Sequence, residues 1–351
     1  MTTPSTRAEM NEYSRYSRQW VLKQIGRDGQ KRLHESRVAV IGLGALGSVS
    51  ANLLARAGVG HLILIDRDYV EVENLQRQVL YDETDLSENL PKAVAAQNKL
   101  AKINSEIRVE AITADVNAST ISELLEPVHL IIDGTDNFET RFLLNDYCLR
   151  EKVPWIYGGV IRTEGMSYVV LPGAGPCLRC LFGDPPAKQD IQTCDQVGIL
   201  APVAHVVASF QATEAIKLLA GHFDEVDRRL WKVDIWNREF KAITLDHFRD
   251  SACSGCQSAD YPYLVKKRGT SAVSLCGRNA VQITVHGPKR LDFKLLAARL
   301  GRKADVKFNH YMLKCRMLPY EITVFTNGRA IVKGTEDAAQ ARSLYAKYIG
   351  A

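Results

Sequence analysis

Hydrophobic residues in the first part of the chain alternate between short continuous runs and longer helical patterns. Apolar runs rich in β-branched residues occur at positions 37–42, 61–66 and 128–133, and a helical pattern joins the first two. Runs of this length are typical of strands that are buried on both faces of a sheet. Strands that alternate with helices predict a doubly wound, Rossmann-like α/β fold with a mostly parallel sheet.

The end of the chain has a different pattern and a different charge. A polar, basic stretch at residues 261–271 predicts a linker, and we place two domains at residues 1–264 and 265–351. The second contains a strand, a helix and a hairpin with a turn at Asn327-Gly328, which predicts a small α+β domain. It has 17 Lys and Arg against 5 Asp and Glu, a net charge of +12, whereas the first has 28 against 35, or −7. This contrast indicates an acidic partner for the second domain, or a solvated basic face without a specific partner.

Composition and apolar patterning exclude some classes of protein. The chain has 351 residues, of which 46% are hydrophobic and 24% charged, as in a globular protein. No apolar run is long enough to span a membrane, and the N-terminus has no signal-peptide core. We therefore expect a cytoplasmic protein without membrane contacts. Eight cysteines in that setting indicate metal binding or catalysis before disulfides.

Four of these cysteines form two C-x-x-C pairs, Cys177 with Cys180 and Cys253 with Cys256. Two such pairs supply four thiolates, which is the ligand set of a closed, structural Zn²⁺ site. The pairs are separated by 72 residues, more than in a zinc ribbon, so the metal would join distant segments of the chain. A redox-active pair and free buried thiols are the alternatives.

A glycine-rich turn follows the first predicted strand. Gly42, Gly44 and Gly47 form the pattern G-x-G-x-x-G, which includes Ala45, and Asp66 follows about 20 residues later. Such a turn brings backbone amides and a helix N-terminus to the phosphates of an adenine nucleotide, and the acidic residue binds the ribose. The turn alone does not separate ATP from NAD or FAD, or from a turn that binds nothing.

Charged residues near this turn favour a triphosphate over a dinucleotide. Arg77 follows Asp66, Lys92 lies at the start of a predicted helix, and Asp136 and Asn137 follow a later strand. The carboxyl ends of these strands meet at the sheet edge where such folds bind ligands. Two cations can neutralise phosphoryl oxygens, and a carboxylate can hold Mg²⁺. Hydride transfer needs none of these groups, although each alone is compatible with a surface salt bridge.

Several motifs resemble the ubiquitin-activating-enzyme-like family, whose bacterial members include the ThiF, MoeB and HesA types. The motifs are RYSRQ (15–19), GLGALG (42–47), DRDYVEVENLQRQ (66–78), PKA (91–93), GTDNFETR (134–141) and ILAPV (199–203). The resemblance covers about residues 13–258 and is greatest to the ThiF type. LCGRNAVQI and VFTNGRAIVKGT are also similar to an extra C-terminal domain of some ThiF-type proteins. One departure is Ala45, where MoeB-like turns have a third glycine.

The resemblance implies that the chain is an adenylyltransferase acting on a protein. The C-terminal carboxylate of a ubiquitin-like sulfur carrier ending in Gly-Gly attacks the α-phosphate of ATP, which gives an acyl-adenylate and pyrophosphate. A carboxylate is already ionised at neutral pH, so the reaction needs no general base. The ThiF type implies a ThiS-like carrier in thiamin (thiazole) biosynthesis, and a MoaD-like carrier for molybdopterin is the alternative. A cysteine desulfurase or another donor would supply the sulfur.

Matching positions imply roles for individual residues. Those implied to bind the nucleotide are Gly42, Gly44, Ala45, Gly47, Asp66, Asp68, Asn74, Arg77, Gln78, Lys92, Asp136 and Asn137. Among them Arg77, Lys92 and Asp136 would act in catalysis, and Asp136 would bind Mg²⁺. Arg18 would reach into the ATP site of the partner subunit in a homodimer. The resemblance also supports zinc at the four paired cysteines.

Two further cysteines are candidates for sulfur chemistry. Cys194 lies in a polar loop before the apolar segment 198–207 and matches a cysteine that bonds to the carrier in some members. Adenylation does not require this bond, so a loop cysteine without a chemical role is the alternative. Cys276 lies near Arg278, a cation that would favour its thiolate, and is a candidate persulfide carrier.

Three other functions account for parts of the sequence. An NAD-dependent oxidoreductase would use the glycine turn and Asp66 but has no use for Arg77, Lys92 or Asp136. A non-catalytic interaction subunit would be expected to lack these three residues. Adenylation of another carboxylate or of an RNA base would use the basic domain to hold tRNA, but nucleic acid is the less expected partner.

Overall fold

The computed structural model describes residues 14–125, 127–185, 194–245, 247–265, 271–275, 279–284, 291–301 and 304–350. The chain divides into two compact units, one of residues 1–191 and 199–266, the other of residues 192–198 and 267–351. Each unit is described separately. Among the helices in these described ranges, none combines the length and apolarity that a bilayer crossing requires.

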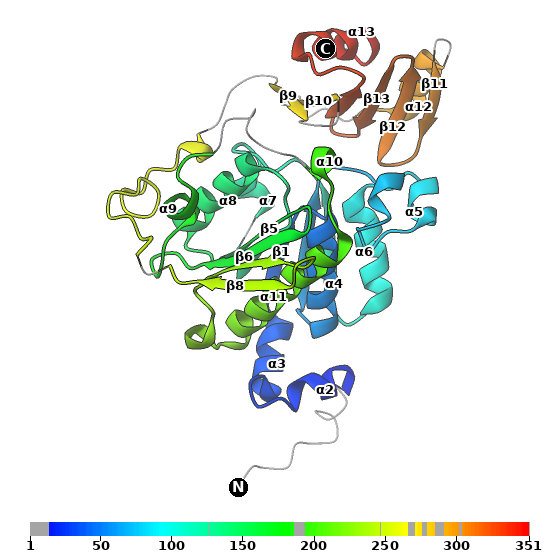
Figure 1. Ribbon diagram of the computed structural model, residues 1–351. Helices are drawn as coiled ribbons and strands as arrows, with labels where there is room; N and C mark the ends of the chain where they lie inside the picture. The colour runs from blue at the N-terminus through cyan, green and yellow to red at the C-terminus, as the bar shows by residue number, and fades with distance from the viewer. Residues whose placement is uncertain are drawn as a thin grey trace. The chain divides into compact units, whose positions relative to one another are not determined.

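An eight-stranded sheet forms the centre of the larger unit (Figure 1). Its strands are β1 (Arg37–Ile41), β2 (His61–Asp66), β3 (Arg108–Thr113), β4 (Leu130–Asp133), β5 (Trp155–Ile161), β6 (Glu164–Val170), β7 (Leu230–Asp234) and β8 (Glu239–Ile243). They lie in the order β3-β2-β1-β4-β5-β6-β7-β8. Pairs from β3 to β5 are parallel, and pairs from β5 to β8 are antiparallel.

Helices cover both faces of this sheet (Figure 1). One layer contains α3 (Gly26–Glu35), α4 (Ala45–Ala57), α6 (Lys92–Ile103) and α11 (Ala201–Ala220), and the other contains α7 (Ile121–Leu124), α8 (Phe138–Glu151) and α9 (Leu178–Phe182). In β1, Val38 and Val40 pack into the first core, and Ala39 and Ile41 pack into the second. A strand that is apolar on both faces is stable only between two layers, and the predicted doubly wound α/β fold is confirmed.

Several short helices complete the description, and all of them except α10 belong to the larger unit. They are η1 (Ser14–Tyr16), α2 (Ser17–Trp20), η2 (Val72–Asn74), α5 (Glu83–Ser87), α10 (Cys194–Val197), η4 (Phe223–Glu225) and η5 (Pro262–Leu264). Strand β1 lies between β2 and β4, so β2 and β3 are added on one side of it and β4 and the later strands on the other. Ligands of open α/β sheets bind at the carboxyl ends of strands at such a switch point.

The smaller unit is an antiparallel sheet with two helices on one face. Its strands are β9 (Ser271–Leu275), β10 (Ala280–Thr284), β11 (Asp305–Phe308), β12 (Met312–Met317), β13 (Tyr320–Phe325) and β14 (Ala330–Lys333), in the order β11-β12-β13-β14-β10-β9. Helices α12 (Phe293–Leu300) and α13 (Ala338–Tyr348) share a core with alternate residues of β10, β12, β13 and β14. The predicted hairpin joins β13 to β14, and Gly328 in its turn has φ of 83°.

Candidate nucleotide site and cysteine cluster

Two glycines of the turn between β1 and α4 are required by the turn itself. The Gly42 N–H donates to the Ile65 carbonyl at 2.8 Å, and its φ is 81°. A Cβ on Gly47 would lie 1.8 Å from the Gly42 carbonyl oxygen. Gly44, which caps α4, differs because the nearest described atom to a Cβ there would be Gln78 Nε2, at 3.8 Å. Packing of the described chain does not require a glycine at position 44, and the open space there would allow a ligand to approach the backbone closely.

Asp66 ends β2 directly beside the glycine turn. Its carboxylate accepts hydrogen bonds from the Leu43 N–H at 2.6 Å and from the Asp68 N–H at 2.7 Å. Burial raises the pKa of Asp66, and the nearby Lys92 ammonium opposes that shift. A carboxylate offers about four lone-pair positions, so the two oxygens can still accept from the hydroxyl groups of a ribose.

Lys92 is a buried cation at the start of α6. It is 4% exposed, and its backbone N–H donates to the Asp68 carbonyl at 2.9 Å. Within the described ranges, its ammonium makes no hydrogen bond and no salt bridge, although it lies near Asp66. A cation at a buried position attracts anions, and in the ligand-free protein the Asp66 carboxylate is one such anion. This position therefore favours an anionic ligand beside the glycine turn.

The segment after β2 carries three more of the predicted nucleotide ligands. The Asn74 side chain is buried and accepts from the Glu71 N–H at 3.2 Å, so its oxygen is occupied by the capping of η2. Gln78 is also buried, and its Oε1 has no hydrogen-bond partner among the described residues. Arg77 is half-buried and donates to the Glu73 carbonyl, and it forms no ion pair with any described residue. Gln78 and Arg77 thus retain polar capacity for a ligand.

Asp136 and Asn137 follow β4 at the same edge of the sheet. Asn137 is the N-cap of α8, and its Oδ1 accepts from the Thr140 N–H at 2.8 Å. Its side-chain oxygen is therefore bound to the helix, and its NH₂ group remains for a ligand. Asp136 is exposed and lies within electrostatic range of Arg67 and Arg141. Exposed carboxylate oxygens are ligands that suit Mg²⁺.

A buried ion pair below this edge was not predicted from the sequence. Asp133 Oδ2 and Arg141 Nε lie 3.2 Å apart, and both residues are buried. Arg141 Nη2 also donates to the carbonyl oxygens of Thr135 and Gly158, at 2.7 and 3.0 Å. These bonds fix the turn that carries Asp136. Two features of the sequence could have indicated this pair. Asp133 is a charged residue at the end of an apolar strand, and Arg141 is a charged residue among buried apolar residues of α8.

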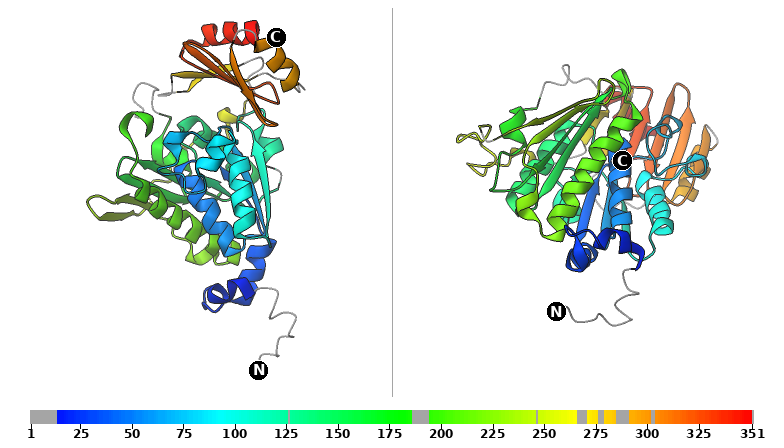
Figure 2. Two further views of the ribbon diagram at one scale, coloured as in Figure 1. Left: turned by 90° about the vertical axis from the view of Figure 1, so that its right-hand side faces the viewer. Right: turned by 60° about the horizontal axis from the view of Figure 1, so that its bottom comes forward.

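Arg18 belongs to helix α2, which lies at the end of the larger unit next to the N-terminus of the described chain (Figure 1 and Figure 2). Its helix, α2, contacts the end of α4, where Gln19 Nε2 donates to the Ala57 carbonyl at 2.8 Å. The glycine turn lies at the start of α4, and 13 residues at about 1.5 Å each separate the two ends by about 20 Å. Arg18 is exposed and does not reach the glycine turn of its own chain.

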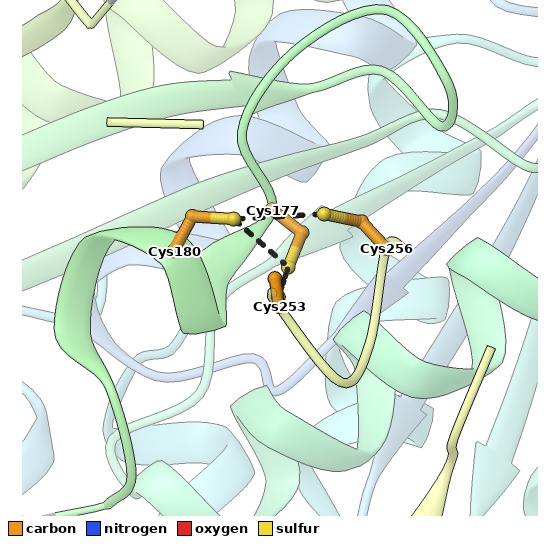
Figure 3. Close-up of side chains that lie close together, drawn as sticks. All are labelled: Cys177, Cys180, Cys253 and Cys256. Carbon is orange, nitrogen blue, oxygen red and sulfur yellow. Dashed lines mark hydrogen bonds between the residues drawn. The ribbon is translucent and has the colours of Figure 1, made fainter. Parts of the chain in front are cut away.

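The four predicted zinc ligands come together, with the two C-x-x-C pairs facing each other (Figure 3). The Sγ atom of Cys177 lies 3.9 Å from that of Cys180 and 3.7 Å from that of Cys253. The Sγ atoms of Cys180 and Cys256 are 3.5 Å apart. Four thiolates about 2.3 Å from a zinc ion form a tetrahedron with edges of about 3.8 Å. Sulfur atoms of a disulfide lie about 2.05 Å apart, so none of these three distances corresponds to a disulfide. The cluster has the dimensions of a tetrathiolate metal site.

The structure describes the side chain of neither candidate sulfur-transfer cysteine. Cys194 begins α10, but its side chain lies outside the described residues, as do residues 186–193. Cys276 also lies outside the described residues. Their predicted roles therefore stay predictions.

Known proteins resemble this chain in sequence and in fold. A family model described as the ThiF family matches residues 16–255. The sulfur carrier protein ThiS adenylyltransferase of Bacillus subtilis is 42% identical over 337 residues, which cover 96% of this chain and 99% of that protein. The SAMP-activating enzyme E1 of Haloferax volcanii is 37% identical over 235 residues, which cover 67% of this chain and 86% of that protein. The crystal structure of E. coli MccB with ATP aligns with a TM-score of 0.59 at 25% identity, covering 70% of this chain and 76% of that one.

Proposed function

Because this chain belongs to the ThiF family, we propose that it adenylates the C-terminal glycine carboxylate of a ubiquitin-like sulfur carrier. The family resemblance predicted from the motifs is confirmed. A carboxylate oxygen of the carrier bonds to the α-phosphorus of ATP, and the bond to the leaving pyrophosphate breaks. The buried ammonium of Lys92, which has no described ion-pair partner beside the glycine turn, carries this proposal. The likeness to a structure determined with ATP supports the choice of nucleotide.

The proposed roles follow from the charges of the two reactants. A carboxylate and a triphosphate repel each other, so the site must neutralise phosphate charge and hold the carboxylate in line with the leaving group. Lys92 and Arg77 supply positive charge, and Gln78 adds an amide. Asp66 would hold the ribose, and Asp136 would hold Mg²⁺, which screens phosphate charge when it is bound. No step requires a protein base, because the nucleophile is ionised at neutral pH.

A ThiS-like carrier of thiamin biosynthesis is the first choice, because the similarity to the ThiS adenylyltransferase extends into the smaller unit. That alignment covers 96% of the chain, whereas the alignment with the SAMP-activating enzyme covers 67%. The test is ATP–pyrophosphate exchange with a panel of purified carriers that end in Gly-Gly. We expect exchange to depend on the carrier and kcat/KM to be highest with the ThiS-like protein. Exchange with no carrier in the panel would contradict the proposed activity, and exchange with a MoaD-like carrier alone would contradict only the choice of carrier.

We also propose that Cys177, Cys180, Cys253 and Cys256 hold a structural zinc ion. The sulfur spacing and the chemistry of four thiolates fit Zn²⁺, and a site with four protein ligands leaves no position for substrate. Four cysteines that serve a metal ion in place of disulfides suit a reducing compartment, which supports the proposed cytoplasmic location.

A homodimer is proposed to complete the ATP site with Arg18 of the partner subunit. The position of α2, far from the glycine turn of its own chain, supports action in the partner's site. Val21 and Leu22, which follow α2, are 69% and 51% exposed, as expected for residues covered by a second subunit. The basic smaller unit is proposed to dock an acidic carrier or a sulfur-donating protein, on the basis of its charge.

Replacing Cys194 with alanine should separate activation from sulfur transfer. Adenylation requires only the carrier carboxylate and ATP, so we expect Cys194→Ala to retain carrier-dependent exchange at close to the wild-type rate. Formation of the thiocarboxylated carrier from a sulfur donor should decrease, and mass spectrometry of the carrier measures it. Loss of exchange in a folded Cys194→Ala protein would show that this residue serves the adenylation site.

A further inference from the structure

Helix α8 binds the first cysteine pair through two adjacent buried residues. Asn145 Oδ1 accepts from the Leu178 N–H at 2.8 Å. Asp146 Oδ2 accepts from Arg179 Nη2 at 3.0 Å and from the Tyr263 N–H at 3.0 Å. Both Asn145 and Asp146 are fully buried. The segment that carries the first two thiols is therefore fixed to a helix that supplies no ligand of its own.

Arg179 connects the two cysteine pairs to each other. It lies inside the first C-x-x-C pair, and its Nη1 donates to Ser254 Oγ, inside the second pair, at 2.9 Å. The same nitrogen lies 3.4 Å from the Asp260 carbonyl oxygen, and the guanidinium lies 5.3 Å from the Tyr263 ring. A planar guanidinium holds two acceptors in a fixed geometry. Asp146, Arg179 and Ser254 thus form one continuous connection from α8 through both pairs.

We propose that Asp146 and Arg179 are positioning residues that hold the two cysteine pairs in ligating geometry before a metal ion binds. The pairs are 72 residues apart in sequence, and bringing such distant segments together carries an entropic cost. The Asp146–Arg179–Ser254 connection brings the two pairs together as the surrounding unit folds. The conformational entropy is then lost before zinc binds, and the metal ion binds to a preformed site. The inference rests on the proposed zinc site and adds that its affinity depends on groups outside the ligand set.

The thiol positions alone do not explain why these charges are buried. The metal-ligating group among the described residues consists of the four cysteines, so Asp146 contributes no ligand. Removing hydrogen-bonded partners around a metal site commonly weakens metal binding about 10- to 100-fold. Asp146→Asn keeps the shape of the side chain but removes the charge that holds Arg179. Ser254→Ala, at an exposed position, removes only the connection to the second pair.

The test measures zinc affinity by competition with a chromogenic chelator, and urea unfolding of the zinc-loaded and metal-free protein. We expect zinc to bind about 10- to 100-fold more weakly in Asp146→Asn, with a smaller loss in Ser254→Ala. The double variant should lose less than the sum of the two, because both act through Arg179. Glu151→Gln, at an exposed position on the same helix, is the matched control and should bind zinc as the wild type does.

Several results would overturn the inference. One is unchanged zinc affinity in Ser254→Ala and in a folded Asp146→Asn. If Asp146→Asn does not fold, Ser254→Ala alone decides. Another is an equal loss of stability in the zinc-loaded and metal-free forms of the variants, because the connection would then support the fold without serving the metal. A wild-type protein that binds no zinc would overturn the zinc site as well, whereas zinc-loaded wild type with unaffected variants overturns only this inference.

Discussion

Replacing Lys92 with methionine should lower carrier-dependent ATP–pyrophosphate exchange on the order of 10³-fold or more, and should also lower the stability of the ligand-free protein. Removing a cation that neutralises transferring phosphate commonly has an effect of this size. We also expect a loss of stability, because the Lys92 ammonium opposes the rise that burial causes in the pKa of Asp66, and its removal leaves that buried carboxylate without the compensating charge. Exchange kinetics and urea unfolding of the ligand-free protein measure the two effects.

The matched control is Lys99→Met on the same helix. Lys99 Nζ forms salt bridges with Asp82 and Asp85, so its loss should reduce stability and leave exchange close to normal. Arg77→Ala should resemble Lys92→Met in activity, since both are proposed to contact the phosphates. Normal exchange in either Arg77→Ala or Lys92→Met would contradict the proposed mechanism.

Zinc at a free concentration of a thousand times Kd should stabilise the larger unit by about 4 kcal/mol relative to the metal-free protein. Zinc joins segments that are distant in sequence, and binding to the folded state alone becomes folding free energy. The stabilisation should be present at neutral pH and should decrease as the pH falls. Burial and the neighbouring thiols raise the pKa of Cys177 to about 11, so protons compete with the metal for this ligand, and metal binding releases them.

Zinc content and the thermal unfolding midpoint between pH 8 and pH 5 check this expectation. Cys180→Ser should lose zinc, whereas Cys148→Ala should retain it, because Cys148 is buried in the core and is not part of the cluster. Where a zinc-depleted sample stays folded, exchange should persist, because a site closed by four ligands has no place for substrate. A chelator that removes zinc without lowering the unfolding midpoint would contradict a structural role.

Local sequence patterns were sufficient for the elements whose stability depends on near neighbours. The turn at Gly42 and Gly47 requires glycine because of contacts within a few residues and with the adjoining strands. The strands at 37–42 and 61–66 were recognisable because they are apolar on both faces. Strands β11 and β12 were not predicted, since charged residues interrupt their apolar pattern and only pairing with their neighbours makes them strands.

The doubly wound fold, the family and the candidate ligands of the nucleotide and the metal could all be predicted from the sequence alone. Short motifs and the periodicity of apolar positions indicate these properties, because both reflect the local geometry of the chain. Three features became visible in the folded chain alone: Lys92 is buried beside Asp66, α2 with Arg18 contacts the end of α4 that lies away from the glycine turn, and Asp146 holds Arg179. Burial, distance and pairing depend on which distant segments pack together, and long-range contacts of this kind leave no local pattern in the chain.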